Sequence, residues 1–200
     1  MIFTPLPRSY YQPSAEEVGP ALLGHYLLRR IGDELCGGEI VETEAYLQND
    51  PACHAYKRQT PRNAAMYGEP GRAYVYLIYG YHFCFNAVCQ PSRVAEAVLV
   101  RAIEPSIGLE TMQQNRKVLR ARDLTNGPAK LCAATRIDRS LDGVDLCDNG
   151  SQLFIAENPQ RSTCLADRGE VVTTTRIGIT QAADWPLRWY LSGSAFVSRR

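Results

Sequence analysis

The chain has 200 residues, of which 45% are hydrophobic and 22% charged, and its formal net charge is +1. This composition is typical of one globular domain spanning residues 1–200, and it excludes a disordered chain or a polycation that coats nucleic acid. The first residues show no signal-peptide pattern, and no apolar run approaches the roughly 20 residues that cross a bilayer, so we expect neither secretion nor a membrane partner.

The cysteines, histidines and basic residues indicate which kinds of binding site the protein can have. Seven cysteines without a CxxC pair and three histidines favour neither a zinc site nor a disulfide framework, so we expect no metal, no cofactor and a reducing cytoplasm. Arginines make up 19 of the 22 basic residues, with clusters at 56–62 and 115–122. Such clusters are either solvated faces or phosphate contacts, since the guanidinium fork suits phosphate.

The N-terminal part predicts a helix and then a long strand. Ser14 and Glu17 form a capping box, and the apolar face of that helix continues through four residues: Leu22, Leu23, Tyr26 and Leu27. Gly19-Pro20 interrupts this helix early. Residues 34–47 read as a strand with a bulge or bend at Gly37-Gly38.

The middle of the chain predicts an irregular loop followed by a hairpin. The loop covers 48–72, with a short helix near 63–67, and a loop of that length is usually functional. Strands at 73–79 and 82–90 meet at Gly80-Tyr81, the length of a tight hairpin turn. A further strand at 97–105 is apolar enough to be buried on both faces.

The last part predicts two helices and then strands. One helix covers 106–121, and a second begins near Pro128 with Thr125 or Asn126 as its N-cap. The segments "EVVTTTRIGIT" and "RWYLSGSAFVS" are strand-rich. The expected fold is therefore mixed α/β (α+β), with mostly antiparallel strands.

Charged residues inside predicted strands are the first candidates for chemistry. Glu42 and Glu44 share one strand face about 6–7 Å apart, which suits acid–base hydrolysis but also a merely solvated strand. Arg101 lies inside "VLVRAIEP", where an unpaired charge is costly, so it must meet a carboxylate in either a structural pair or an active site.

An aromatic run provides the second set of candidates. "YVYLIYGYHFCFN" covers 74–86 and is either a buried hairpin or a surface that stacks on flat ligands. Asn86 ends the run, and His54 alone is more often a structural histidine than a catalyst. All these polar residues fall within 44–101, and this clustering indicates a site.

Six collinear segments make the interpretation specific: "IVETEAY", "HAY…TPRN..M", "YVYLIYGYHFCFN", "VLVRAIEP", "NGPAKLC" and "RWYLSGSAFVS". Together they resemble the 3-methyladenine DNA glycosylase family of the alkyladenine type, from about residue 22 to 198. The resemblance implies a curved antiparallel sheet flanked by helices with a protruding β-hairpin. Three departures from the family pattern are Arg58 in the loop, Gly19-Pro20 and Ala195.

The resemblance also implies roles for individual residues. Glu44 would be the general base and Arg101 would brace Glu44 or the water. The pocket for a flipped base would be formed by Tyr46, His54, Tyr76 and Asn86. Tyr79 would be the wedge, and the remaining DNA contacts would be made by Tyr81, His82, Thr60, Gly127 and Lys130.

The implied function is base excision from double-stranded DNA that contains a damaged purine, alkylated or also deaminated. The enzyme would be a monomer and a monofunctional glycosylase. None of its three lysines is among the candidate catalytic or pocket residues, so no Schiff base is expected. The expected location is a bacterial cytoplasm, with the nucleoid, or a nucleus. Two alternatives stay open: a non-catalytic nucleic-acid-binding module and a hydrolase of small nucleosides or glycosides.

Overall fold

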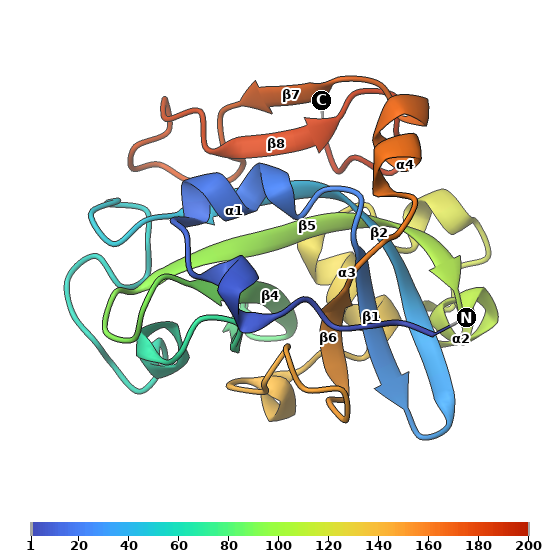
Figure 1. Ribbon diagram of the computed structural model, residues 1–200, viewed down its shortest axis with the longest axis horizontal. Helices are drawn as coiled ribbons and strands as arrows, with labels where there is room; N and C mark the ends of the chain where they lie inside the picture. Colours follow the sequence, from blue (N-terminus) through green and yellow to red (C-terminus); the bar gives the residue numbers. More distant parts are fainter. Residues whose placement is uncertain (1, 200) are drawn as a thin grey trace.

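Antiparallel strands form one curved sheet through the middle of the molecule (Figure 1). The computed structural model describes residues 2–199. The sheet order is β3-β4-β5-β2-β1-β6, while β8 pairs with β2 and with β7. The strands of these residues are β1 (Tyr26–Ile31), β2 (Glu34–Tyr46), β3 (Ala73–Ile78), β4 (His82–Cys89), β5 (Glu96–Ile107), β6 (Leu153–Ala156), β7 (Val171–Thr174) and β8 (Arg188–Leu191).

Short helices flank this sheet. They are α1 (Ala15–Ala21), α2 (Leu109–Arg116), α3 (Pro128–Thr135) and α4 (Arg161–Asp167). In the view of Figure 1, α1 lies in front of β5 and beneath β8, and α3 lies behind the sheet. The predicted α+β class with antiparallel strands is confirmed. Within residues 2–199, no helix has the length and apolar character needed to cross a bilayer.

The first helix is shorter than the sequence predicts. Ser14 and Glu17 form the expected capping box, but α1 ends at Ala21, and the predicted helical residues Tyr26 and Leu27 begin β1 instead. Pro20 lacks the N–H that would bond one turn back, and Gly24 turns the chain with φ 81°. The apolar residues are buried as expected, because a short apolar run does not distinguish helix from strand.

Gly19 permits a close approach between α1 and β8. A Cβ added there would lie 2.6 Å from Cζ3 of Trp189, so any larger residue would push the two elements apart. The departure at Gly19-Pro20 therefore has a packing role.

β2 is the central strand and pairs with β1, β5 and β8. The predicted irregularity at Gly37-Gly38 is confirmed by a shift in the pairing register with β5. A Cβ at Gly37 would lie 2.0 Å from the Leu27 carbonyl oxygen, and one at Gly38 would lie 1.9 Å from that of Glu104. Only glycine fits between these neighbouring strands.

Other boundaries also differ from prediction. The hairpin turn has three residues, 79–81, since Ile78 pairs with His82. The helix predicted over 106–121 covers only α2 and ends where Lys117 takes a left-handed φ of 54°. The N-cap of α3 is Gly127 rather than Thr125 or Asn126, because the Thr125 hydroxyl donates to the Ile103 carbonyl oxygen instead.

The C-terminal part contains less strand than predicted and two additional elements. Only β7 and β8 form in the segments predicted as strand-rich, while β6 and α4 were not predicted. All seven cysteines are free thiols, in agreement with the sequence interpretation.

Candidate active site

The strand register aligns one row of side chains across five strands. Tyr74 on β3 pairs with Asn86 on β4, Asn86 with Leu99 on β5, Leu99 with Glu44 on β2, and Glu44 with Arg188 on β8. Residues directly opposite each other project from the same face of a sheet. The pairing thus places Glu44 of β2 in one row with the aromatic hairpin β3–β4, about 30 to 40 residues further along the chain.

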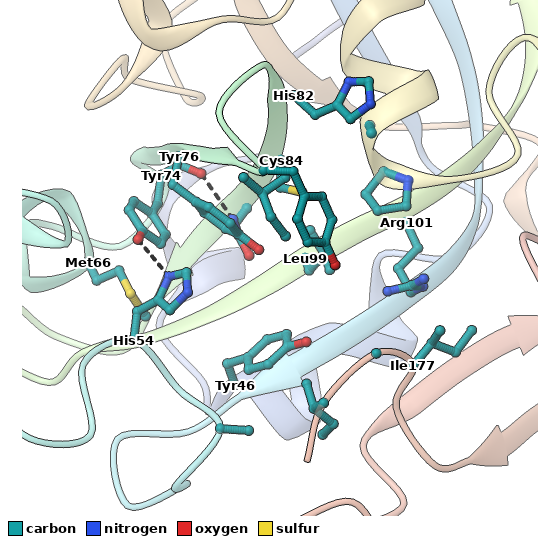
Figure 2. A pocket seen from close by; sticks show the side chains of 18 residues that line it. Tyr46, His54, Met66, Tyr74, Tyr76, His82, Cys84, Leu99, Arg101 and Ile177 are labelled. Carbon is teal, nitrogen blue, oxygen red and sulfur yellow. Dashed lines mark hydrogen bonds between the residues drawn. The ribbon is translucent and has the colours of Figure 1, made fainter. Parts of the chain in front are cut away.

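A pocket of about 350 Å³ opens on this face. Figure 2 shows His54, Tyr74 and Tyr76 on one side of it and Arg101 and Ile177 on the other. The lining residues are Tyr46, Ala52, His54, Met66, Tyr74, Tyr76, Ile78, Tyr79, His82, Cys84, Asn86, Leu99, Arg101, Pro128, Ala129, Ile177, Gly178 and Ile179.

Glu44 is fully buried, and pocket-lining residues hold its carboxylate. Oε2 accepts a hydrogen bond from the Tyr46 hydroxyl at 2.9 Å and lies 3.1 Å from Nη1 of Arg101. Oε1 accepts from the backbone N–H of Ile177 at 2.8 Å. Oε2 thus has two partners, whereas Oε1 has one, so a lone pair remains for a further donor at Oε1.

Arg101 reaches both glutamates from an irregularity in β5. Thr43 pairs with Val100 and Glu42 with Ala102, so Arg101 is the unmatched residue at a bulge. Bulges re-aim a side chain and occur often beside functional sites. Nη1 of Arg101 contacts Glu44, and its Nε lies 3.4 Å from Oε1 of Glu42. The buried arginine therefore has the carboxylate partners that the sequence required.

Neither glutamate lines the pocket itself, and they differ in their partners: those of Glu44 line the pocket, whereas those of Glu42, apart from Arg101, do not. Oε1 of Glu42 accepts from Nη1 of Arg188 at 2.7 Å and from the Ser198 hydroxyl at 3.0 Å, while its Oε2 accepts from the Ser198 N–H at 2.7 Å. These partners belong to β8 and the C-terminal segment. Glu42 is thus a structural anchor, and the two glutamates do not form a pair of catalytic carboxylates across one substrate.

His54 lies in the long loop at the edge of the pocket. Its Nδ1 is 2.9 Å from the Tyr74 hydroxyl, the contact dashed in Figure 2, and its ring packs edge-on against Tyr76 with centroids 4.5 Å apart. Burial, with a smaller contribution from Arg62, lowers the pKa of His54. The imidazole is therefore neutral at pH 7. Its orientation depends on Tyr74, which the sequence interpretation did not single out.

The tyrosines at the pocket remain protonated. Burial, followed by the charge of Glu44, raises the pKa of Tyr46 far above its usual range, and burial does the same for Tyr76. The Tyr46 hydroxyl can therefore donate to Glu44 at any physiological pH. Asn86 donates through Nδ2 to the Tyr74 carbonyl oxygen at 3.1 Å, and the other end of its amide is available to the pocket.

The tip of the hairpin projects into solvent. Tyr79 and Tyr81 are 76% and 72% exposed, although both are large aromatic residues. Tyr79 has a φ of 53° and Gly80 a φ of 79°, so the strand alternation stops at Ile78 and Tyr79 turns toward the pocket mouth. A left-handed conformation at a non-glycine residue costs roughly 1–2 kcal/mol. Such strain is concentrated at functional sites.

The start of α3 borders the same opening. Pro128 and Ala129 line the pocket, Gly127 precedes them, and Lys130 is exposed with its Nζ 2.8 Å from the Asn126 side-chain oxygen. His82 also lines the pocket, and its ring lies 4.2 Å from that of Tyr81.

Thr60 does not line the pocket. It lies in the loop, where its N–H donates to Oδ1 of Asn63, and Nδ2 of Asn63 donates to the carbonyl oxygens of His54 and Arg58. Arg58 has no positive φ, so the loop does not need a glycine at that position.

Sequence reasoning missed the wall formed by residues 176–179. Ile177 donates to Glu44, and Arg176 is buried with its Cζ 4.8 Å from the centroid of the Tyr46 ring. The signal was an arginine in the apolar stretch "RIGIT", the same kind of signal that identified Arg101. Within residues 2–199, no three His, Cys, Asp or Glu side chains are grouped in a way that could hold a metal ion.

Comparison with known proteins identifies the family. The family model described as methylpurine-DNA glycosylase (MPG) matches residues 9–195. A protein of Carboxydothermus hydrogenoformans named "Putative 3-methyladenine DNA glycosylase" is 45% identical over 98% of this chain and 99% of its own length. A protein of the same name from Francisella tularensis strain SCHU S4 is 44% identical over 90% and 91%.

Both comparisons cover the buried carboxylate, the aromatic hairpin and the start of α3, and the resemblance seen in the sequence is confirmed. The chain belongs to the methylpurine-DNA glycosylase family, and it is a DNA glycosylase that acts on alkylated bases.

Proposed function

We propose that this protein flips a damaged purine out of double-stranded DNA into the pocket and hydrolyses its N-glycosidic bond with a water activated by Glu44. The observation that carries the proposal is a buried carboxylate behind an aromatic pocket, next to an exposed tyrosine at a hairpin tip. The enzyme acts as a monofunctional glycosylase and as a monomer.

Base flipping follows from the position of the carboxylate. A glycosidic bond inside a duplex cannot reach a buried group, so the nucleotide must rotate out at a cost of a few kcal/mol. Tyr46, Tyr76 and His54 offer ring surfaces to the extruded base, and stacking on such rings contributes about 1–3 kcal/mol per base. Tyr79 would fill the gap that the base leaves in the duplex, which restores stacking there. The side-chain amide of Asn86 would contact the edge of the extruded base and discriminate between purines.

Glu44 and Arg101 would carry the chemical step. The Glu44 carboxylate can accept a proton from water and can stabilise the positive charge that develops on the sugar. Arg101 and the Tyr46 hydroxyl occupy Oε2 and the Ile177 N–H takes one lone pair of Oε1, so the remaining lone pair of Oε1 would accept the proton from water. Alkylated purines carry positive charge already and leave without an added proton. His54, neutral at pH 7, orients the base rather than protonating it.

The absence of lyase chemistry is inferred from the pocket lining. None of the described lining residues is a lysine. Schiff-base formation requires an amine nucleophile at the sugar. Water is therefore the nucleophile that the site favours.

Phosphate contacts would flank the pocket. The N-terminus of α3, from Gly127, carries free N–H groups and a positive dipole end that suit a phosphate, with Lys130 nearby. Tyr81 and His82 would follow the minor groove beside Tyr79, while Thr60 would contact the backbone from the loop.

The test is base release from a duplex with a single alkylated purine, measured beside release from the free nucleoside. We expect release from the duplex only, and Glu44→Gln should lower the single-turnover rate about 10³-fold, within the range of general-base catalysis. The variant should still bind the lesion duplex, because no DNA contact is lost. Unchanged release by Glu44→Gln would remove this residue from the mechanism.

A further inference from the structure

We propose that Arg176 is a positioning residue that fixes the orientation of the Glu44 carboxylate by holding two of the groups that bond to it. The inference rests on the proposed role of Glu44 as the base. Arg176 does not touch the carboxylate itself, and it acts through Tyr46 and Ile177.

The guanidinium group of Arg176 is held rigidly inside the protein. Its side chain and that of Asp50 are both fully buried and form an ion pair, with Nη2 of Arg176 3.0 Å from Oδ1 and Nη1 in contact with Oδ2. Nη1 also donates to the Ala45 carbonyl oxygen at 2.9 Å. Ala45 lies between Glu44 and Tyr46, so this bond fixes the strand at the site.

The first route to Glu44 runs through Tyr46. Cζ of Arg176 lies 4.8 Å from the centroid of the Tyr46 ring, a cation–π distance that restricts the ring. The hydroxyl of that ring donates to Oε2 of Glu44 at 2.9 Å. Moving the guanidinium would therefore move the donor.

The second route runs through the backbone. Ile177 follows Arg176 directly, and its N–H donates to Oε1 of Glu44 at 2.8 Å. Since the side chain of Arg176 is anchored to Asp50 and Ala45, the start of this segment cannot shift relative to β2. One residue therefore supports the donors to both oxygens of the carboxylate.

The charge of Arg176 persists despite its burial. Burial lowers its pKa, but the hydrogen bonds and charge of Asp50, with smaller contributions from Tyr46 and Glu44, raise it overall. A lysine in its place would keep the charge and lose the planar fork that reaches Asp50, Ala45 and the ring together.

Arg168 provides a matched control. Like Arg176 it forms ion pairs inside the fold, with Glu39 at 2.6 Å and Glu104 at 3.0 Å, but neither it nor these two partners line the pocket. Arg168→Lys therefore measures the effect of losing a guanidinium fork without affecting Glu44.

The experiment compares single-turnover base release, lesion-duplex affinity and melting temperature for Arg176→Lys and Arg168→Lys. We expect Arg176→Lys to slow release about 100-fold, the size of effect that a small misplacement of a catalytic group produces, with affinity within about threefold of the wild type. Arg168→Lys should release the base at the wild-type rate. Equal rates for the two variants would overturn the inference.

A double-mutant cycle separates positioning from general loss of structure. In a Tyr46→Phe background, Arg176→Lys should cost at least about threefold less than in the wild type, because one of its two routes is already gone. Arg168→Lys should remain additive. A fully additive Arg176→Lys would overturn the role through Tyr46.

Two further variants keep the outcomes distinct. If Arg176→Lys does not fold, Asp50→Asn replaces it and should slow release more than Arg168→Lys does; an unchanged rate would refute the inference. Normal release by Glu44→Gln would overturn the proposed function itself, whereas an inactive Glu44→Gln with a fully active Arg176→Lys would overturn only this inference.

Discussion

Glu42 and Glu44 lie two residues apart on β2, both are fully buried, and both contact Arg101. Their other partners differ. Glu42 bonds to Arg188 and to the Ser198 N–H and hydroxyl, which lie away from the pocket. Glu44 bonds to Tyr46 and the Ile177 N–H, which form the pocket wall.

Burial and charge are the same for both glutamates, so only their hydrogen-bond partners distinguish the structural Glu42 from the candidate catalytic Glu44. A carboxylate surrounded by the C-terminal segment can only stabilise the fold. A carboxylate whose hydrogen-bond donors line a cavity lies directly behind the wall of that cavity. Arg101 contacts both glutamates, so a substitution at Glu42 should also affect Glu44, but less than a substitution at Glu44 itself.

The substitution Glu42→Gln is the strongest test of the difference between the two glutamates. It leaves Arg188 without its carboxylate, and loss of one partner of a buried ion pair costs about 3–5 kcal/mol. Urea denaturation should show that loss in the free energy of unfolding, with base release slowed far less than by Glu44→Gln. If Glu42→Gln abolished release in a fully folded protein, the division between the two glutamates would be wrong.

His25 is a second buried structural residue, and it makes the stability of the fold depend on pH. It is buried, its Nδ1 accepts from the Asn158 N–H at 3.2 Å, and burial, then Arg161, lowers its pKa to about 4. In the unfolded chain the pKa of a histidine is near 6.5, so between about pH 4 and 6.5 the unfolded state binds more protons than the folded state. The contribution of neutral His25 to the free energy of unfolding is therefore complete above about pH 6.5 and is lost as the pH falls toward 4.

The expected loss at His25 is roughly 3 kcal/mol by pH 4. Urea unfolding at pH 7.5, 5.5 and 4 should therefore show a steeper decline for the wild type than for His25→Gln. Parallel declines would show that His25 does not contribute to acid sensitivity.

The exposed tip of the hairpin is the opposite case, since it should matter for DNA and not for the fold. Tyr79→Ala should weaken affinity for lesion duplex by about 1–3 kcal/mol, the value of one stacked base. Its melting temperature should stay near that of the wild type because the side chain is 76% exposed. Leu119→Ala, at an 86% exposed residue outside the pocket lining, should change neither quantity.

Tyr74→Phe should have the smallest effect. It removes the hydroxyl beside Nδ1 of His54 and keeps the packing, so about 1 kcal/mol of interaction is lost. We expect base release to be a few-fold slower. The same reduction should be seen at pH 7 and pH 8, because burial lowers the pKa of His54 and keeps it neutral there. An effect equal to that of Glu44→Gln would place His54 in the chemical step.

Local pattern predicted the parts of the site that lie on single strands. Arg101 was recognisable because a charge in an apolar strand must find a partner, and the hairpin because two aromatic strands flank a glycine. The pattern alone left Glu44 either an acid–base group or a solvated strand charge. The apolar residues 22–27 were assigned to a helix because burial alone does not determine the period. The roles of individual pocket residues came from the resemblance to the family and not from their spacing.

Long-range contacts were beyond such reasoning. Arg176 and Asp50 are 126 residues apart, and Ile177 and Glu44 are 133 apart, so nothing local indicates that they meet. The left-handed φ of Tyr79 was equally hidden, since an aromatic residue rarely adopts it.

The contact between Ser198 and Glu42 spans 156 positions along the chain. During synthesis, the carboxylate at the centre of the sheet emerges from the ribosome long before the serine that completes its surroundings. Over that interval neither Arg188 nor the Ile177 amide is available either, so the two acids of β2 have only Arg101 and, for Glu44, Tyr46 as partners. A nascent chain that stops before these residues lacks the N–H donor to Glu44 and the C-terminal partners of Glu42, so the surroundings of both carboxylates are completed only near the end of synthesis.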